Sequence, residues 1–291
     1  MKYVFKGSCV AIVTPFCDGR VDFDSFKRLI EFQLKNKTDA IVVLGTTGEP
    51  ATLSEQEKES IIVFAKKIIG DKAKLIVGTG TNSTTKSINQ SMLAQDCGAD
   101  ALLCVTPYYN KCTQKGLIEH FKMIASSVDI PIIVYNVPSR TGVNILPETA
   151  LELSKIDNIC GIKEASGNIS QIVKLSKLLK DKMAIYSGDD SLNYVFMTLG
   201  AYGCISVTAN VLPKQVKKVI DFALMGEYEK AREMHEKLLE INNNLFVEVN
   251  PIPVKFACSY LGLCQNQLRL PLTPLDKKFE STVIDSLKVF E

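Results

Sequence analysis

Eight short runs of apolar residues, rich in valine and isoleucine, recur between residues 9 and 207. Each run is almost continuously hydrophobic, which is typical of parallel strands that are buried on both faces. The runs are 9–13, 40–44, 75–78, 101–105, 130–135, 159–163, 184–187 and 203–207. The pattern therefore predicts eight buried parallel strands.

Segments with helical periodicity separate these runs. Ser54 and Glu57 form a capping-box pattern at the start of a helix that we expect to end at Gly70. In residues 117–125 the apolar side chains fall on one helical face. Pro147 stands where the first position of a further helix is expected. Strands and helices thus alternate along most of the chain.

This alternation predicts either a doubly wound sheet or a closed barrel, and the number of units favours a (β/α)8 barrel. No GxGxxG follows the first strand and no GxxxxGK[ST] occurs, so dinucleotide and P-loop enzymes lose support. After residue 226 the pattern becomes purely helical. We expect residues 1–225 to form the barrel and residues 226–291 to form a C-terminal helical appendage, packed on the barrel or at an oligomer interface.

The charge balance argues against two classes of partner. The 34 basic and 32 acidic residues leave a net charge of +2, without any block of like charges. Neither nucleic acid nor an anionic membrane surface is favoured as a partner. No apolar run approaches the roughly 18 residues that span a bilayer. The first 16 residues are too polar for a secretory signal, and we expect a cytoplasmic location.

Cysteine and histidine usage narrows the chemistry. The nine cysteines are odd in number and include no CxxC pair, so we expect buried, reduced thiols. The only two histidines, His120 and His235, lie in helical patterns. A Ser-His-Asp or Cys-His mechanism and a zinc site are therefore disfavoured, and no metal is expected. Lysine, tyrosine, threonine, arginine or carboxylates remain as candidates.

Lys163 is the strongest candidate nucleophile. In a barrel enzyme the chemistry lies at the carboxyl ends of the strands, and Lys163 ends an apolar run. Desolvation of an amine favours its neutral form, which attacks a carbonyl to form a Schiff base. The structural alternative is a strand-end lysine that extends to solvent or pairs with Glu164.

Three other strand ends carry suitable polar groups. Tyr135 ends the preceding strand and could transfer a proton beside Lys163. Thr46 and Thr47 lie in a turn between glycines that could hold a carboxylate. Arg140 follows a proline and could bind a second carboxylate. Each has a structural alternative: a core tyrosine, an ordinary capping loop and a surface ion pair.

Six segments together carry a resemblance that covers nearly the whole chain. They are GTTGE at 45–49, VTPYYN at 105–110, YNVPSRTG at 135–142, GIKEASG at 161–167, SGDD at 187–190 and SVTAN at 206–210. In this order they resemble the dihydrodipicolinate synthase and N-acetylneuraminate lyase family of class I aldolases. Arg140 and the two threonines of GTTGE are similar to the synthase branch rather than to the sialic acid lyases.

The resemblance implies a role for each matching residue. Pyruvate would condense with Lys163, and Tyr135 would move protons in a relay through Thr46 and Tyr109. Tyr109 would reach the active site of a neighbouring subunit, which implies at least a dimer and commonly a homotetramer.

The remaining positions would bind the substrates. Thr47 and Ile205 would hold the pyruvate part, and Gly188 would line the pocket. Arg140 would hold the carboxylate of L-aspartate-4-semialdehyde, the aldehyde that the pyruvate enamine attacks. The product would feed lysine and diaminopimelate synthesis, and no metal or organic cofactor is implied.

The resemblance also bears on regulation. Lysine-inhibited members bind lysine through groups aligned with Ala51, Glu55, Lys58, Asn82, Lys86 and Tyr108. Lys86 stands where those members have a glutamate, and Glu55 and Lys58 stand where they have histidines. A lysine at position 86 would repel the ammonium group of the effector, so we expect weak or absent feedback inhibition.

Two other functions stay open on the sequence alone. One is another pyruvate-dependent aldolase of the family, which would cleave a sialic acid or a 2-keto-3-deoxy sugar acid. The other is a catalytically silent barrel that acts as a sensor or scaffold. The four residues Lys163, Tyr135, Thr46 and Tyr109 argue against a silent protein.

Overall fold

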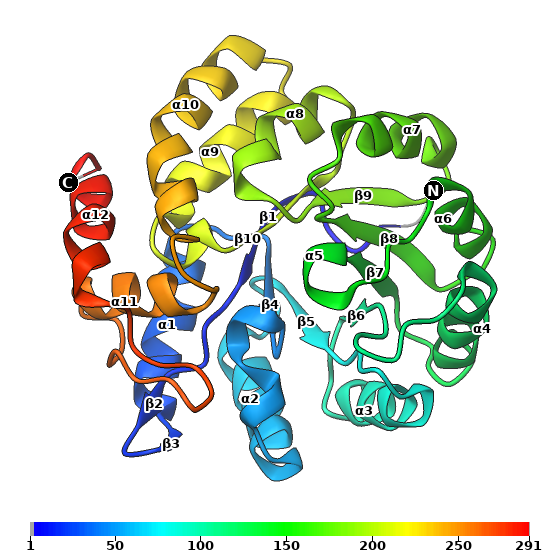
Figure 1. The fold of residues 1–291 in the computed structure, drawn as a ribbon, viewed down its shortest axis with the longest axis horizontal. Helices are drawn as coiled ribbons and strands as arrows, with labels where there is room; N and C mark the ends of the chain where they lie inside the picture. Colours follow the sequence, from blue (N-terminus) through cyan, green and yellow to red (C-terminus); the bar gives the residue numbers. More distant parts are fainter. Residues whose placement is uncertain (1–2, 291) are drawn as a thin grey trace.

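The computed structural model of the chain describes residues 3–290 and contains a closed barrel of eight parallel strands (Figure 1). The barrel strands are β1 (Gly7–Ala11), β4 (Ala40–Val43), β5 (Lys74–Gly78), β6 (Ala101–Val105), β7 (Ile132–Asn136), β8 (Ile159–Glu164), β9 (Ala184–Ser187) and β10 (Gly203–Ser206). Each strand pairs with the next one along the chain, and β10 closes the ring against β1. The predicted (β/α)8 barrel is confirmed.

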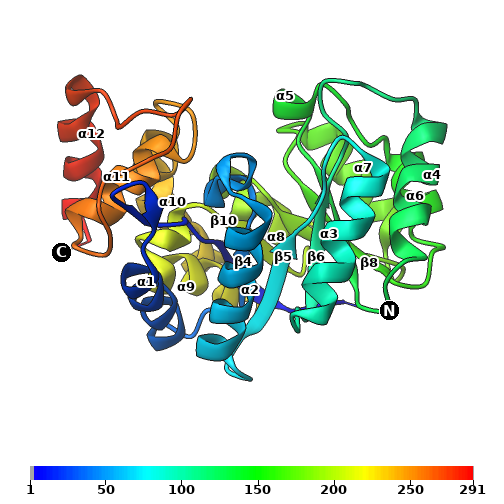
Figure 2. The ribbon, with the colours of Figure 1, turned by 90° about the horizontal axis from the view of Figure 1, so that it is seen from below.

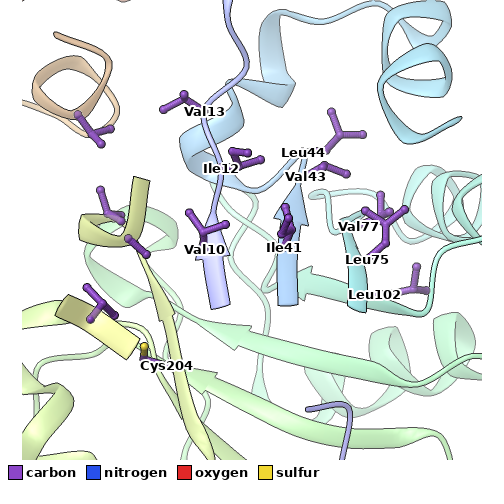
Figure 3. Packing of buried hydrophobic residues seen from close by; sticks show 14 of the residues in the cluster. Val10, Ile12, Val13, Ile41, Val43, Leu44, Leu75, Val77, Leu102 and Cys204 are labelled. Carbon is purple, nitrogen blue, oxygen red and sulfur yellow. The ribbon is translucent and has the colours of Figure 1, made fainter. Parts of the chain in front are cut away.

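Alternate residues of the strands enter two different cores. Cys9, Ala11 and Ile205 belong to a buried cluster inside the barrel. Val10 and Ile41 point outward and pack with residues of the surrounding helices, as Figure 3 shows for part of this outer cluster. A strand that is buried on both faces needs apolar residues at nearly every position, which explains the continuous hydrophobic runs.

Helices cover the outside of the barrel between successive strands (Figure 1). They are α1 (Phe23–Lys35), α2 (Glu55–Ile69), α3 (Thr84–Asp96), α4 (Gln114–Ala125), α6 (Pro147–Leu153), α7 (Ile169–Leu179), α8 (Asn193–Thr198) and α9 (Pro213–Leu224). Helix α2 begins with the predicted capping box of Ser54 and Glu57 and has Gly70 as its C-cap, and Pro147 is the first residue of α6. Within residues 3–290, no helix combines the length and the apolar character required to cross a membrane.

A short hairpin that the sequence reading did not foresee follows β1. Its strands are β2 (Phe16–Cys17) and β3 (Arg20–Val21), which pair antiparallel. Asp18 and Gly19 connect them, both with positive φ. Asp-Gly is a preferred sequence for such two-residue turns.

The predicted C-terminal helices are present, and an irregular segment separates the last two of them. These helices are α10 (Tyr228–Asn244), α11 (Ile252–Tyr260) and α12 (Lys277–Lys288). Residues 261–276 form neither helix nor strand, and they contain Pro271 and Pro274, which cannot donate a backbone hydrogen bond. Figure 2 shows α11 and α12 on the side of the molecule away from α4 and α6.

Candidate active site

A cavity of about 720 Å³ lies at the carboxyl ends of the barrel strands. Six of the residues singled out from the sequence line it together: Thr46, Thr47, Tyr135, Arg140, Lys163 and Gly188. They lie at or just beyond the ends of four different strands, β4, β7, β8 and β9, as expected for a barrel enzyme whose site is assembled from several strand ends.

Lys163 and Tyr135 face each other inside the barrel. Strands β7 and β8 pair these two residues in register, and the Lys163 Nζ lies 4.3 Å from the centre of the Tyr135 ring. Lys163 is only 5 % exposed and Tyr135 only 7 %. The lysine therefore does not extend to solvent. It also does not pair with Glu164, whose carboxylate is bound by other groups.

Gly188 makes room for the lysine side chain. A Cβ atom at position 188 would lie 2.9 Å from the Lys163 Cε and 3.0 Å from its Cγ. These separations are shorter than carbon atoms tolerate, so a side chain here would displace the amine from its place opposite Tyr135. The N–H group of Gly188 also donates to the carbonyl oxygen of Glu164, at 2.8 Å, and thereby joins β9 to β8.

The GTTGE segment forms a tight turn that the C-terminal region holds in place. Thr47 is buried, and its Oγ1 accepts a hydrogen bond of 3.0 Å from the Asn250 Nδ2. Glu49 adopts the left-handed conformation, with φ 54°. Its buried carboxylate accepts a hydrogen bond of 2.8 Å from the Lys255 Nζ. The turn is thus more than a helix cap, because residues about 200 positions away fix two of its side chains.

Arg140 lies at the open edge of the cavity, in the one-turn helix α5 (Pro138–Thr141). Its Nη2 donates to the carbonyl oxygen of Asn250 at 3.0 Å, an interaction that replaces the surface ion pair considered from the sequence. The Thr106 hydroxyl bonds the Thr141 hydroxyl at 3.0 Å and ties this helix to the end of β6. The guanidinium is therefore held over the cavity while it stays exposed.

Two of the residues singled out from the sequence do not line the cavity. Ile205 is 1 % exposed, pairs with Cys9 and belongs to the cluster inside the barrel. Tyr109 is 93 % exposed and has a positive φ of 71°, so its ring projects into solvent beyond the cavity of its own chain.

Sequence reasoning missed Asn250 and Asp189, which both line the cavity. Asn250 is 5 % exposed, and its Oδ1 has no hydrogen-bond partner among residues 3–290. Burial of the Asp189 carboxyl raises its pKa above the usual value, although the Ser191 N–H donates to it. A polar residue between apolar neighbours in EVNPIPV was a usable signal for Asn250. The signal for Asp189 is its place in the SGDD motif, just after the strand that ends at Ser187.

Neither histidine lines this cavity, although His235 bonds the backbone of Ser191, which does. His120 in α4 bonds the Thr84 hydroxyl at 2.9 Å, and His235 in α10 bonds the carbonyl oxygen of Ser191 at 3.0 Å. Among residues 3–290, no three histidine, cysteine, aspartate or glutamate side chains are grouped so as to hold a metal ion.

A larger cavity of about 1030 Å³ adjoins the first and shares Thr46, Tyr135 and Arg140 with it. It is lined by all six positions that the resemblance assigns to lysine binding: Ala51, Glu55, Lys58, Asn82, Lys86 and Tyr108. The Lys58 Nζ lies 2.8 Å from the Glu55 carboxylate, so these two charges compensate each other. Lys86 has no such partner within the described residues and adds a positive charge to this wall.

Comparison with known proteins decides the family. Residues 4–289 match the dihydrodipicolinate synthetase family. The chain belongs to this family. A 4-hydroxy-tetrahydrodipicolinate synthase of Alkaliphilus oremlandii is 48 % identical over 285 residues, which cover 98 % of both chains. One of Caldicellulosiruptor saccharolyticus is 52 % identical over 276 residues, which cover 94 % of this chain and 93 % of the relative.

A solved structure agrees with the family assignment. The crystal structure of dihydrodipicolinate synthase from Aquifex aeolicus is 47 % identical and superimposes with a TM-score of 0.96, over 98 % of each chain. The resemblance inferred from the six motifs is thereby confirmed. The likeness extends through the C-terminal helices, so the dihydrodipicolinate synthetase family shares this region together with the barrel.

Proposed function

We propose that this member of the dihydrodipicolinate synthetase family condenses pyruvate with L-aspartate-4-semialdehyde through a Schiff base on Lys163. The product would be 4-hydroxy-tetrahydrodipicolinate, in lysine and diaminopimelate biosynthesis. The relatives reported above carry the name of this synthase. The observation that carries the proposal is a buried lysine amine beside a tyrosine ring, in a cavity at the end of the barrel.

In the first half of the reaction, the neutral Lys163 amine attacks the ketone carbon of pyruvate. The resulting carbinolamine loses water to give an iminium ion, and loss of a methyl proton converts the iminium ion into an enamine. Tyr135 lies beside the amine and would donate and accept these protons, connected through Thr46 to Tyr109. Burial of Lys163 supports this role, because it shields the amine and the intermediates bound to it from bulk water.

In the second half, the enamine carbon attacks the aldehyde carbon of the second substrate and forms the new carbon–carbon bond. The amino group of that substrate then attacks the iminium carbon, closes the ring and releases Lys163. Arg140 would hold the substrate carboxylate at the mouth of the cavity, because a guanidinium matches a carboxylate with two parallel hydrogen bonds.

Pyruvate would lie between Thr47 and Gly188. The Thr47 hydroxyl already accepts from Asn250 and is oriented by that bond, so its own proton remains for the pyruvate carboxylate. The Ile205 side chain is buried in the barrel interior, and a contact from this residue would therefore come from its backbone.

Tyr109 supports an oligomeric enzyme. Its ring is almost fully exposed and lies outside the cavity of its own chain, so the relay requires a neighbouring subunit to bring this residue to the site. We therefore propose a dimer in which each subunit supplies Tyr109 to the site of the other, and, as the family resemblance implies, a homotetramer of two such dimers. Nine free cysteines are typical of a reducing compartment and support a cytoplasmic location.

Mass spectrometry tests the nucleophile. The protein is incubated with pyruvate and sodium borohydride, digested and mapped. We expect one reduced pyruvate adduct on the peptide that contains Lys163. Lys255 is an internal control, since it is fully buried but bonded to the Glu49 carboxylate and should remain unmodified. An unmodified protein, or an adduct on another lysine, would overturn the mechanism.

A second assay tests the aldehyde partner. Consumption of L-aspartate-4-semialdehyde in the presence of pyruvate should require Lys163. In Arg140→Ala the KM for the semialdehyde should rise at least about tenfold, since a charge-assisted bidentate contact is lost, while pyruvate adduct formation stays unchanged. Cleavage of sialic acid or of a 2-keto-3-deoxy sugar acid at a higher kcat/KM than the condensation would instead favour another aldolase of the family.

A further inference from the structure

The residue that directly follows Lys163, Glu164, carries a buried carboxylate. Glu164 is fully buried and accepts three hydrogen bonds from uncharged groups. One oxygen accepts from the Asn136 Nδ2 at 2.8 Å and from the Gln171 Nε2 at 3.2 Å. The other accepts from the Ser166 N–H at 2.7 Å. A buried carboxylate is unfavourable unless such donors surround it, so this site is built for the carboxylate.

The donors belong to a larger polar network. The Asn136 Nδ2 also donates to the Asn144 Oδ1 at 2.8 Å, and the Ile145 N–H donates to the Asn136 Oδ1 at 2.8 Å. The Asn144 Nδ2 in turn donates to the Gln171 Oε1 at 2.8 Å. Glu164 in β8 therefore accepts directly from Asn136 in β7 and Gln171 in α7. Through Asn136 the network also reaches Asn144 and Ile145, which precede α6.

The network lies on the opposite face of the strands from the reaction. Successive residues of a strand point to opposite faces, and Asn136 and Glu164 directly follow Tyr135 and Lys163. Strands β7 and β8 pair Tyr135 with Lys163 and then Asn136 with Glu164. The side-chain bond between Asn136 and Glu164 thus joins β7 to β8 on the outer face of the barrel, one residue beyond Tyr135 and Lys163 on the inner face.

A register irregularity between β7 and β8 precedes the paired residues Tyr135 and Lys163. Ile132 pairs with Ile159, whereas the next residue, Ile133, pairs with Gly161, so Cys160 is an extra residue in β8. A shift of one residue moves a side chain to the other face of a strand. Lys163 and Tyr135 pair beyond this irregularity. There the two strand ends are joined by the side-chain bond between Asn136 and Glu164 and by a backbone bond of 2.9 Å from the Ala165 N–H to the Asn136 carbonyl oxygen.

We propose that Glu164 is a positioning residue for the Schiff-base reaction: its carboxylate holds β8 against β7 so that the Lys163 amine stays opposite Tyr135. Glu164 contacts neither substrate. The inference rests on the proposed role of Lys163. It adds that the network on the outer face determines how fast the amine attacks pyruvate.

The test is Glu164→Gln, which keeps the size of the side chain. The amide has one accepting oxygen in place of two, and its NH2 group would face a donor, so at least one bond in the network is lost. We expect pyruvate adduct formation at Lys163 and kcat to fall at least about tenfold, since a misplacement of about 1 Å can cost about 100-fold. The KM for L-aspartate-4-semialdehyde should change less than about twofold, because Arg140 is held separately by Asn250.

The matched control is Asp39→Asn. The Asp39 carboxylate also joins two strands, since it precedes β4 and accepts from the Ser8 N–H of β1 at 2.8 Å, but it lies at the amino end of the barrel. We expect Asp39→Asn to lower the Tm while the rate of adduct formation stays within about twofold of the unmodified chain, since no group of the cavity depends on it.

Each outcome decides the inference. A folded Glu164→Gln protein that forms the adduct at the rate of the unmodified chain would overturn it. If Glu164→Gln does not fold, Gln171→Met removes one of the three donors to Glu164, together with the bonds between Gln171 and Asn144. This variant should slow adduct formation about threefold, and an unchanged rate in it would equally overturn the inference. If the unmodified chain forms no adduct at Lys163, the proposed function itself fails, and that result is distinct from a Glu164→Gln protein that reacts normally.

Discussion

The ion pair between Lys255 and Glu49 offers a sharp test of how the C-terminal region supports the site. The Lys255 Nζ lies 2.8 Å from the Glu49 carboxylate, and the two side chains are 0 % and 1 % exposed. The ammonium also donates to the carbonyl oxygens of Thr14 and Gln267, at 2.5 and 3.2 Å. We consider the substitution Lys255→Met, which keeps much of the volume and removes the charge.

The expected cost follows from the burial of the pair. Without the ammonium, the Arg269 N–H at 3.2 Å is the one donor left to the Glu49 carboxylate among the described residues, and an uncompensated buried charge costs about 3–5 kcal/mol. Domains are stable by about 5–15 kcal/mol, so the variant should fold but unfold at a clearly lower urea concentration. With m near 2–3 kcal/mol/M, the midpoint should fall by more than about 1 M. The condensation rate should also fall, because Glu49 ends the turn that carries Thr47.

Urea unfolding followed by circular dichroism measures this effect, with Lys217→Met as the control. Lys217 forms a similar contact of 2.9 Å with Asp39, but the two side chains are 18 % and 31 % exposed, and we expect a cost of at most about 1 kcal/mol. In the double variant Glu49→Gln/Lys255→Met the cost should be less than the sum of the two single costs. If Lys255→Met is no more destabilising than Lys217→Met, the reasoning is refuted.

Three further predictions use other parts of the structure. Gly188→Ala should lower pyruvate adduct formation at least about 100-fold in a folded protein, because the new Cβ would displace Lys163; trapping by borohydride measures it. The hydrogen bond from Arg269 lowers the pKa of Glu57 to about 2. The stability that this carboxylate contributes is therefore present above about pH 4.3 and lost as the pH falls towards 2, so Glu57→Gln should show a smaller decline of Tm over this range. Sub-millimolar L-lysine should leave the condensation rate unchanged, whereas Lys86→Glu should increase sensitivity to it; half-inhibition of the unmodified chain would refute this.

The barrel could be predicted because its strands carry a strong local signal. Runs such as 40–44 and 101–105 are apolar at every position, and a short run of this kind is typical of a parallel strand that is buried on both faces. The hairpin of β2 and β3 was missed although Asp18 and Gly19 carry its turn signal, because strands of two residues show no periodicity. The irregular segment 261–276 contains Pro271 and Pro274, which cannot donate the backbone hydrogen bonds of a helix, and it separates α11 from α12.

In the candidate site, too, some features could be predicted from the sequence and others could not. Lys163 and Tyr135 could be placed together because each ends an apolar run, and neighbouring strand ends meet on one face of a barrel. The contacts of Thr47 with Asn250 and of Glu49 with Lys255 join residues more than 200 positions apart, and no local pattern reports such a pairing. These contacts are set by tertiary packing, which a single sequence does not display.

Two sets of contacts outside the cavity therefore hold the site in place, and neither was predicted from the sequence. On the outer face, Glu164 binds Asn136 and so holds the strand ends that carry the amine and the phenol. From the C-terminal region, Asn250 bonds both the Thr47 hydroxyl and Arg140, through its side chain and its backbone respectively. Since the first support acts on the nucleophile and the second on the groups that bind carboxylates, their loss should affect different steps. Loss of the Glu164 carboxylate should slow the attack on pyruvate, whereas loss of the Asn250 side chain should weaken the binding of pyruvate through Thr47 and leave the backbone bond to Arg140 in place.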